Sequence, residues 1–311
     1  MVLLCFTVSK ACAQETAFEK ILWTTDWSPD GKYIAVGGNT DTLKIFRAKD
    51  LQLSKSYAIP HTITCVKWHP FKNILAIGTQ SSDNKVLILD FETDKRIELA
   101  GISPDGARGI DWNYSGDYLA VGDNDGQTSI VDIEGKKIRV IQQENTKSIT
   151  SIDWHPDKNI FITVGDKIRM YDIDGTLLKS IIHRQEDVLL LSVAWHNSGD
   201  FFVTGDYGDT QHDYKPLLQF WNSNGDLIKS IGISKGEYRN LAWNPNGNRL
   251  ASASDALRIW DKEGNLKSVG NSIDYLWGVS WNRKGSSIVT SDTAQRIILW
   301  DNKAKVKTIM E

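Results

Sequence analysis

Short apolar segments alternate with polar turns along nearly the whole chain. The apolar segments are too short for typical helices and are rich in Val, Ile, Thr and aromatic residues, a pattern typical of strands. In the first repeat of the pattern we expect strands at about residues 21–27, 32–37, 43–47 and 52–59. In the fourth repeat we expect them at about 149–154, 160–164, 167–171 and 176–182. The pattern therefore predicts four short strands per repeat, joined by turns rich in Gly, Pro, Asn and Asp.

A segment led by tryptophan returns seven times, each time with a polar turn and a short apolar strand after it. The repeat tryptophans are Trp27, Trp68, Trp112, Trp154, Trp195, Trp243 and Trp281. Their successive spacings are 41, 44, 42, 41, 48 and 38 residues. A period of roughly 40–45 residues indicates a propeller array, in which each small sheet covers the faces of its neighbours. We therefore predict an all-β fold, a seven-bladed β-propeller with four antiparallel strands per blade, formed as one domain by residues 20–311.

Two further features recur in register with the tryptophans. The expected third strands end in Trp260-Asp261 and Trp300-Asp301, or in degraded forms of this dipeptide at Phe46-Arg47, Leu89-Asp90, Val131-Asp132, Tyr171-Asp172 and Trp221-Asn222. The expected turns between second and third strands carry Asp41, Asp83, Asp125, Asp166, Asp209, Asp255 and Asp292. In these motifs the chain resembles the WD-repeat (beta-transducin-like) propellers over residues 20–311.

The usual Gly-His pair of that family is missing, and only His61 stands at a similar place. We therefore expect the blades to depend on packing more than on the buried Asp–His–Ser–Trp hydrogen-bond network that the resemblance implies.

Composition narrows the function classes. A formal net charge of −3 over 311 residues argues against a dedicated nucleic-acid binder, which is usually basic. There is no run of about 18 apolar residues, so no membrane span is predicted. The three cysteines, Cys5, Cys12 and Cys65, form no disulfide framework or metal-ligand spacing, and we expect Cys65 to be a small buried residue.

The first residues permit two interpretations. Residues 2–8 are apolar, and Ala11-Cys12-Ala13 before Gln14 matches the cleavage pattern of a secretory signal. No basic residue precedes the apolar run, and Lys10 follows it. The alternative is a strand that closes the last blade, but residues 304–310 already supply its fourth strand. We expect residues 1–13 to be a signal peptide or a disordered N-terminus, which favours a secreted or periplasmic location over a cytoplasmic one.

Candidate chemistry is sparse. Asp172-Ile-Asp174-Gly-Thr is similar to the nucleophile loop of haloacid-dehalogenase-like phosphatases, but the same turn follows most third strands and the helices of that fold are missing. His183 and His212 could approach each other near Asp209 and Asp213, although isolated surface histidines are far commoner than metal sites. We predict no catalytic residue, no metal and no cofactor.

Three histidines follow a repeat tryptophan directly and occupy turn positions. They are His69, His155 and His196. Other repeats carry Ser or Asn at that place, so we expect these imidazoles to make local hydrogen bonds rather than to ligate a metal.

Two tryptophans remain once the repeat is accounted for. Trp23 and Trp277 stand four residues before a repeat tryptophan, where the innermost strand of a blade begins near the mouth of the central channel. Two of the equivalent positions hold Arg108 and Arg239. Interfaces are enriched in Trp, Tyr and Arg. We hypothesise a docking patch whose members are Trp23, Arg108, Tyr238, Arg239, Tyr275 and Trp277. The alternative is that Trp23 and Trp277 only fill volume between blades.

The fifth repeat carries an insertion. Gly205 to Asn222 spans seventeen residues, against seven from Gly165 to Asp172. The excess, residues 207–216, includes three rings, those of Tyr207, His212 and Tyr214. Insertions in repeat arrays often lie on the binding face, but surface loops also tolerate inert insertions.

The sequence as a whole favours a non-catalytic scaffold that binds a protein or peptide at the channel mouth, as a monomer. One alternative is a propeller hydrolase or lyase with its site at the same mouth, because fold alone does not decide function. Another is a subunit of a larger cytoplasmic complex of the trafficking or translation type.

Overall fold

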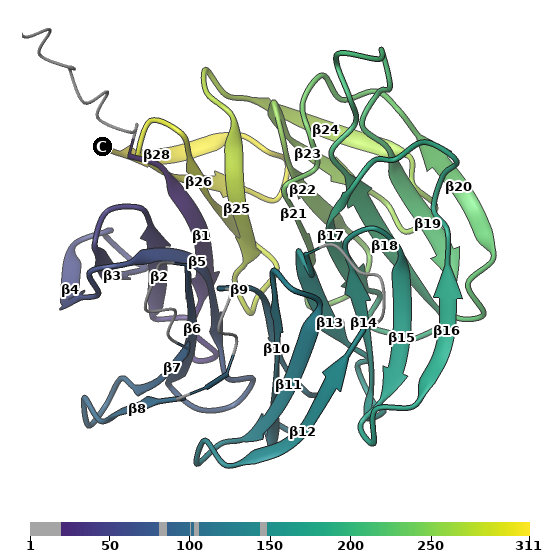
Figure 1. Ribbon diagram of the computed structural model, residues 1–311. Coiled ribbons are helices and arrows are strands. Elements are labelled where there is room, and N and C mark those ends of the chain that lie inside the picture. Colours follow the sequence, from purple (N-terminus) through teal and green to yellow (C-terminus); the bar gives the residue numbers. More distant parts are fainter. Residues whose placement is uncertain (1–19, 81–85, 100, 103–105, 144–147) are drawn as a thin grey trace, which may run out of the picture.

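Seven four-stranded antiparallel sheets stand around a central axis as the blades of a β-propeller (Figure 1). The computed structural model describes residues 20–80, 86–99, 101–102, 106–143 and 148–311. Each sheet consists of four consecutive strands, so the predicted fold class is confirmed. The signal peptide expected at residues 1–13 lies outside the described residues and stays a prediction.

Blades 1 to 4 follow the chain in order. Their strands are β1 (Leu22–Trp27), β2 (Tyr33–Gly38), β3 (Thr42–Arg47), β4 (Leu53–Ala58), β5 (Thr62–Trp68), β6 (Ile74–Gln80), β7 (Val86–Asp90), β8 (Arg96–Glu98), β9 (Ala107–Trp112), β10 (Tyr118–Asp123), β11 (Gln127–Asp132), β12 (Lys137–Gln142), β13 (Ser151–Trp154), β14 (Ile160–Val164), β15 (Ile168–Asp172) and β16 (Leu177–Ile181). The predicted boundaries differ from these by one or two residues in blades 1 and 4; the largest difference is at β13, which begins at Ser151 rather than at residue 149.

Blades 5 to 7 complete the ring. Their strands are β17 (Leu190–Trp195), β18 (Phe201–Asp206), β19 (Leu218–Asn222), β20 (Leu227–Ile231), β21 (Asn240–Trp243), β22 (Leu250–Ala253), β23 (Ala256–Trp260), β24 (Leu266–Asn271), β25 (Leu276–Trp281), β26 (Ser287–Asp292), β27 (Ile297–Asp301) and β28 (Val306–Met310). The last strand, β28, forms the outer edge of blade 7, as expected from residues 304–310.

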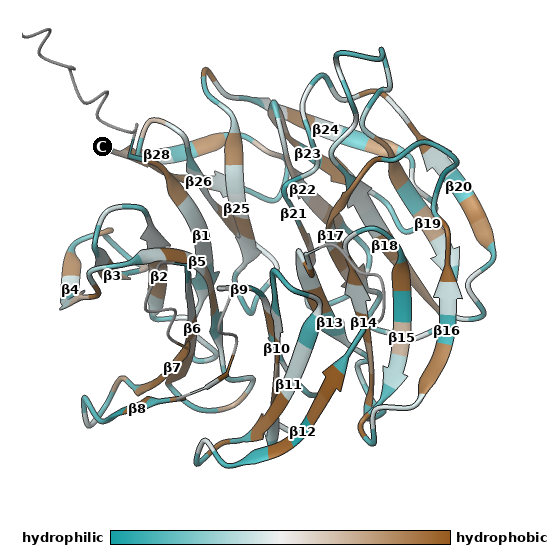
Figure 2. Cartoon of the chain, in the orientation of Figure 1, coloured by the Kyte–Doolittle hydropathy of each residue, from teal (hydrophilic) through white to brown (hydrophobic). Residues whose placement is uncertain are grey.

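The hydrophobic core lies mainly between neighbouring blades. Leu43 and Ile45 of blade 1, for example, pack in one cluster with Ile63 and Leu75 of blade 2. The second and third strands are buried at almost every position, which explains their continuous apolar runs. The outer strands are largely exposed but keep hydrophobic segments, visible on β12 and β20 in Figure 2.

A glycine near the end of a second strand lets the next blade approach closely. A Cβ atom on Gly37 would lie 2.5 Å from the side chain of Ile63, and one on Gly122 would lie 2.4 Å from Ile149. The strand-ending glycine of the repeat therefore has a packing function between blades, in addition to any role in the turn.

The ring closes where β1 lies beside β25 (Figure 1). The Ser280 hydroxyl donates a hydrogen bond to the Asp26 carboxylate at 2.8 Å, and the Trp27 backbone N–H donates to the Ser280 hydroxyl at 3.3 Å. The Arg283 guanidinium donates to the Pro29 carbonyl at 3.0 Å. Packing and these polar contacts therefore join the described ends of the ring.

Three blades contain part of a buried Asp–His–Ser–Trp network. The indole N–H groups of Trp221, Trp260 and Trp300 donate to the hydroxyls of Thr204, Ser252 and Thr290 at 2.9, 3.0 and 2.9 Å. The indole–hydroxyl part of the network is therefore present in blades 5 to 7, and the expectation that the blades depend more on packing stays a prediction.

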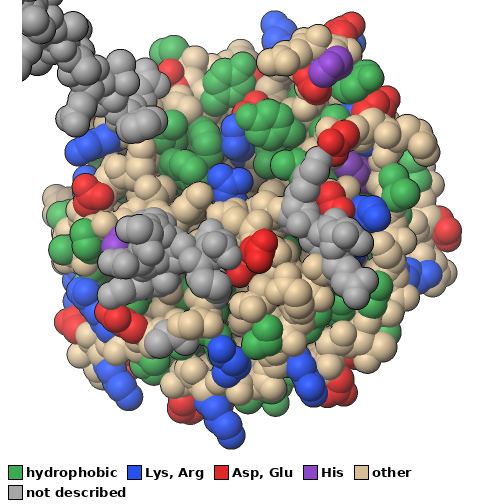
Figure 3. Space-filling model, viewed as in Figure 1, with side chains coloured by type: hydrophobic (Ala, Val, Ile, Leu, Met, Phe, Trp, Pro, Cys, Tyr) green, Lys and Arg blue, Asp and Glu red, His purple; other side chains and the backbone are tan. Residues whose placement is uncertain are grey.

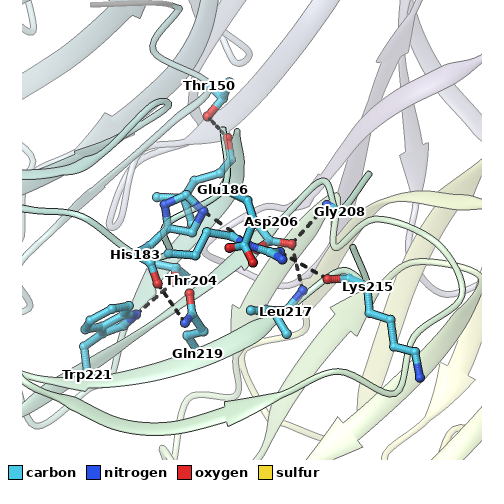
Figure 4. A network of polar contacts seen from close by, with 12 residues as sticks. Thr150, His183, Glu186, Thr204, Asp206, Gly208, Lys215, Leu217, Gln219 and Trp221 are labelled. Carbon is cyan, nitrogen blue, oxygen red and sulfur yellow. Dashed lines mark hydrogen bonds and ion pairs between the residues drawn. The ribbon is translucent and has the colours of Figure 1, made fainter. Parts of the chain in front are cut away.

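In blade 5 a histidine also lies near the aspartate of the network, without a hydrogen bond between the two side chains (Figure 4). The buried His183 lies with its Nε2 atom 3.7 Å from the Asp206 carboxylate, while Gln219 donates to the His183 carbonyl at 3.1 Å. His183 therefore stands where the WD-repeat family has the histidine of its Gly-His pair, a place that we had assigned to His61 alone. The sequence interpretation missed His183 because no glycine precedes it.

In two blades, the aspartate that ends the second strand also accepts hydrogen bonds from the following turn. In blade 5, Asp206 accepts the backbone N–H groups of Gly208 and Leu217 at 3.1 and 2.7 Å, while Asp209, in the turn where we expected it, accepts those of Gln211 and His212. In blade 3, Asp123 rather than Asp125 accepts the turn N–H groups. Asp83 lies outside the described residues.

Candidate interface at the channel mouth

The first strand of each blade lines the central channel, and a cavity of about 160 Å³ opens where these strands begin. Figure 3 shows basic side chains beside hydrophobic ones near the centre of this face. The residues that line the cavity include Trp23, Arg108, Arg239 and Trp277, which come from four different blades. The structure therefore brings together four of the residues that the sequence placed at the channel mouth.

Arginine and aromatic side chains form a continuous row across this mouth. The rings of Trp23 and Trp277 lie 4.9 Å apart between centroids at an interplanar angle of 37°. The Arg108 guanidinium lies 5.9 Å from the Trp23 ring, and that of Arg239 lies 3.9 Å from the Trp277 ring. Arg239 also lies 5.3 Å from the ring of Tyr207. We call Arg108, Trp23, Trp277, Arg239 and Tyr207 the mouth row; its contacts are of the cation–π and aromatic kinds.

The two arginines of the mouth row differ in their partners. The Arg239 guanidinium pairs with the Glu237 carboxylate. Arg108 has no ion pair within the described part of the chain, and its buried Nε atom has no hydrogen-bond partner there. Burial, and then the nearby charge of Arg239, lower the pKa of Arg108, but a guanidinium stays protonated in proteins. Among the described residues of the mouth, Arg108 is therefore a cation without an ion-pair partner.

Two expected members of the docking patch lie outside the mouth row. Tyr238 is 0% exposed and packs with Leu241 and Leu250 in the core between blades 5 and 6, so it cannot offer its ring to a partner. Tyr275 is 48% exposed, with its ring close to Gly236 on the rim of the same face. The prediction for Tyr238 is corrected to a core role, whereas Tyr275 remains an accessible neighbour of the row.

The insertion of blade 5 adds to this face. Its first residue, Tyr207, is 49% exposed and belongs to the mouth row. The loop is held by two backbone hydrogen bonds between Asp209 and Tyr214, of 2.7 and 2.8 Å. The Tyr214 ring stacks on His212 at 5.8 Å and lies 5.5 Å from the Arg184 guanidinium. Through Tyr207, the insertion is continuous with the channel mouth.

The suggested approach of His183 and His212 in a metal site does not form. His183 is buried against Asp206, whereas the exposed imidazole of His212 lies 2.6 Å from Asp209. Within the ranges that the structure describes, no group of three or more His, Cys, Asp or Glu side chains could hold a metal ion. Each imidazole therefore has a separate carboxylate neighbour.

Deeper in the channel, residues directly before the repeat tryptophans connect the blades. The carboxylates of Asp26, Asp111 and Asp153 accept the backbone N–H groups of the next blade's tryptophan, Trp68, Trp154 and Trp195, at 2.9, 2.9 and 2.6 Å. We call these three carboxylates the channel carboxylates. The Lys67 ammonium lies 3.2 Å from Asp111 and is the basic group among them. Sequence reasoning missed this arrangement, although the signal, an acidic residue before the tryptophan, is visible in three repeats.

Burial governs the protonation of the channel groups. It raises the pKa of Asp26, and burial together with the charge of Asp111 raises that of Asp153. Burial also raises the pKa of the Cys65 thiol, which lines the mouth cavity, to about 12. A thiol with so high a pKa is a poor nucleophile near neutral pH.

The histidines after the repeat tryptophans do more than the local hydrogen bonding that we expected. His69 accepts the backbone N–H groups of Phe71 and Lys72 at its Nδ1 atom, both at 3.0 Å. Its Nε2 atom lies 3.1 Å from the Gly116 carbonyl of the next blade. His155 and His196 reach Gly199 and Gly247 in the same way. These imidazoles therefore join adjacent blades.

Two models of known protein families match this chain. The WDR19 first beta-propeller model matches residues 23–199, and the model of the WD domain, G-beta repeat, matches residues 221–261. Within the described residues, no helix is long and apolar enough to cross a membrane.

The similar curated proteins are larger than the matched segments. The chain is 27% identical over 179 residues to the F-box-like/WD repeat-containing protein TBL1X of Macaca fascicularis and 28% identical over 163 residues to that of Homo sapiens. These matches cover 52% and 47% of the chain but 31% and 28% of those proteins. The anaphase-promoting complex subunit cdc20 of Dictyostelium discoideum is 25% identical over 288 residues, which cover 85% of the chain and 54% of that protein.

Proposed function

Because the chain belongs to the WD-repeat family of β-propellers, we propose that it is a non-catalytic platform that binds a protein or peptide partner at its channel mouth. Proteins of this family are typically interaction scaffolds. The observation that carries the proposal is the mouth row, a set of rigid aromatic and arginine side chains contributed by five blades and gathered on one face. Residues of these types dominate the binding energy of many protein interfaces.

The chemistry of the mouth cavity supports binding rather than catalysis. Of the side chains that line it, Cys65 has a raised pKa, Lys67 is paired with Asp111, and Asp153 accepts a backbone hydrogen bond. Each of these groups is therefore protonated or occupied by a structural contact, whereas catalysis needs a nucleophile beside an available base. The exposed rings of Tyr207 and Tyr275 extend the surface available to a partner.

Affinity capture from native extract tests the proposal. Wild type is compared with the double variant Arg239→Ala, Trp277→Ala, which removes two members of the mouth row. The matched control is Phe71→Ala, Lys72→Ala, an exposed aromatic residue and cation in the turn after β5, at the opposite end of the strands from the mouth. We expect the partner to be retained by wild type and by the control and lost by the mouth variant. Equal capture by all three, with unchanged melting temperatures, would show that the mouth is not the docking site.

A further inference from the structure

Arg108 is distinguished by its isolation from counter-charges at the channel mouth. It has a buried Nε atom without a hydrogen-bond partner and no ion pair within the described residues. An unpaired polar atom in a buried position costs free energy, which a ligand group could recover. Arg108 lies 5.9 Å from Trp23, so the ring holds the guanidinium at the cavity wall without neutralising it.

The other charged groups at the cavity already have an ion-pair or hydrogen-bond partner. Arg239 pairs with Glu237, and Lys67 pairs with Asp111. Asp153 lies at the same cavity but accepts the Trp195 N–H at 2.6 Å. Among the described residues that line the cavity, Arg108 is therefore the cation without an ion-pair partner, and its guanidinium complements a carboxylate.

The size of the cavity limits what can enter it. Small-molecule sites are usually about 300–1,000 Å³, whereas this cavity measures about 160 Å³. That volume admits one acidic side chain, and the channel continues below it into a second cavity of about 550 Å³. The rings of Trp23 and Trp277 flank the position, and Tyr207 extends the row outward, so the rest of a peptide has an aromatic surface to lie on.

We propose that the partner of the channel mouth carries an Asp or Glu side chain, whose carboxylate enters the cavity and pairs with Arg108 while its flanking residues pack on Trp23, Trp277 and Tyr207. The inference rests on the proposed function and specifies the chemistry of its partner. A carboxylate fits better than a phosphate monoester, because the latter carries a charge of about −1.5 to −2 at neutral pH and would face one unpaired cation among the described residues, Arg108.

A peptide selection identifies the preferred chemistry directly. A phage-displayed library of random nonapeptides is selected on the full wild-type chain, and an enriched peptide is synthesised with a fluorophore. We expect the enriched sequences to share an Asp or Glu at one position. The acidic residue of the synthetic peptide is then replaced by Gln and, separately, by phosphoserine, and all three forms are measured by fluorescence polarisation.

Each peptide is measured on wild type, on Arg108→Met and on Lys235→Met. Lys235→Met is the matched control, since it removes the same charge from an exposed loop between blades 5 and 6. We expect replacement of the acid by Gln to weaken binding to wild type and to Lys235→Met by about tenfold or more, as for the loss of a charge-assisted hydrogen bond. On Arg108→Met, the acidic and Gln peptides should bind equally within about twofold.

Four results would overturn the inference. They are enriched peptides without a shared acid, the same loss on Arg108→Met as on wild type, tighter Arg108-dependent binding of the phosphoserine peptide, and failure to enrich any peptide. Enriched peptides without a shared acid that bind wild type but not the Arg239→Ala, Trp277→Ala variant would refute the role of the carboxylate and leave the proposed platform function in place. Failure to enrich any peptide would count against both. Melting temperatures of all variants establish that loss of binding is not loss of the fold.

Discussion

The guanidinium carbon of Arg239 lies 3.9 Å from the centroid of the Trp277 ring, although Arg239 precedes β21 of blade 6 and Trp277 belongs to β25 of blade 7. This contact therefore connects two blades as well as forming part of the mouth row. It makes the row rigid before a partner arrives, and preorganised residues lose less entropy on binding.

A double-mutant cycle on the unbound protein measures that connection. We expect Arg239→Ala and Trp277→Ala to be non-additive, with a coupling of about 0.5–1 kcal/mol in the free energy of unfolding, as for a partly exposed cation–π pair. Urea denaturation of wild type, the two single variants and the double variant gives this value. Strict additivity would mean that the two side chains are merely adjacent.

Much of the mouth could be predicted by assigning each tryptophan to a position in the repeat, because Trp23 and Trp277 were the two that the repeat did not explain. Tyr238 was assigned wrongly because successive residues in an extended chain point to opposite faces. Arg239 faces the channel, so its neighbour Tyr238 faces the core. The place of Tyr207 depends on the path of the inserted loop, which no local pattern encodes.

The repeat itself was the most predictable feature, since each strand obeys the same local rules in every blade. The missed features are contacts across blades, such as the pairing of Lys67 with Asp111 or the hydrogen bond from the Trp68 backbone N–H to Asp26. Such contacts need knowledge of which positions of neighbouring repeats face each other, and this comes only with the closed ring.

The buried His183 predicts a loss of stability in mild acid. Burial, and then the charge of Arg184, lower the pKa of His183 to about 4, with Glu186 and Asp166 acting in the opposite direction. Arg184 lies 3.0 Å from the same Asp206 oxygen that faces the imidazole, so the carboxylate is neutralised without a charged histidine. At pH values between the ordinary histidine pKa of about 6.5 and the folded value, His183 is protonated in the unfolded chain and neutral in the folded chain. The free energy of unfolding should therefore fall by up to about 3 kcal/mol as pH decreases through that window.

Chemical denaturation at a series of pH values compares wild type with His183→Gln. The variant should be less stable near neutral pH but should lose less stability on acidification, because the titrating group is gone. His61→Gln, at a partly exposed histidine, serves as the control and should keep the wild-type profile. Parallel profiles for wild type and His183→Gln would refute the assignment.

Lys67 is predicted to lower the pKa values of Asp26 and Asp153, which burial raises. Replacing Lys67 by Met should raise the pKa values of Asp26 and Asp153 further, since the attraction of the ammonium lowers both. A carboxyl with a raised folded pKa contributes stability at low pH and loses it as pH rises through that pKa. The Lys67→Met variant should therefore be less stable than wild type by about 3 kcal/mol near neutral pH, because buried charges are left unpaired, and by less near pH 5.

Thermal or urea unfolding of Lys67→Met at both pH values checks this. Lys44→Met, at an exposed position of β3, removes the same formal charge without touching the channel and should show a small deficit independent of pH. A Lys67→Met deficit that is equal at both pH values would mean that the lost interaction is packing by the lysine stem rather than compensation of charge.

The contact between His69 and Gly116 predicts which turn glycines of the repeat tolerate a side chain. Gly116 has a φ of 78°, and Gly31, at the same place in the first repeat, has a φ of 71°. A Cβ atom on Gly116 would lie 2.3 Å from the Nε2 atom of His69, whereas a Cβ on Gly31 would meet nothing within 4 Å. Since Nδ1 of His69 accepts backbone N–H groups, Nε2 carries the proton and donates to the Gly116 carbonyl. Gly31→Ala should therefore cost only the backbone strain of about 1 kcal/mol, while Gly116→Ala should cost about 2–3 kcal/mol because it also displaces the imidazole between two blades.

Urea denaturation of both variants, and of each combined with His69→Ala, measures the difference. If the extra cost of Gly116→Ala comes from the imidazole, it should disappear in the His69→Ala background, whereas an unchanged difference would place the strain in the turn itself.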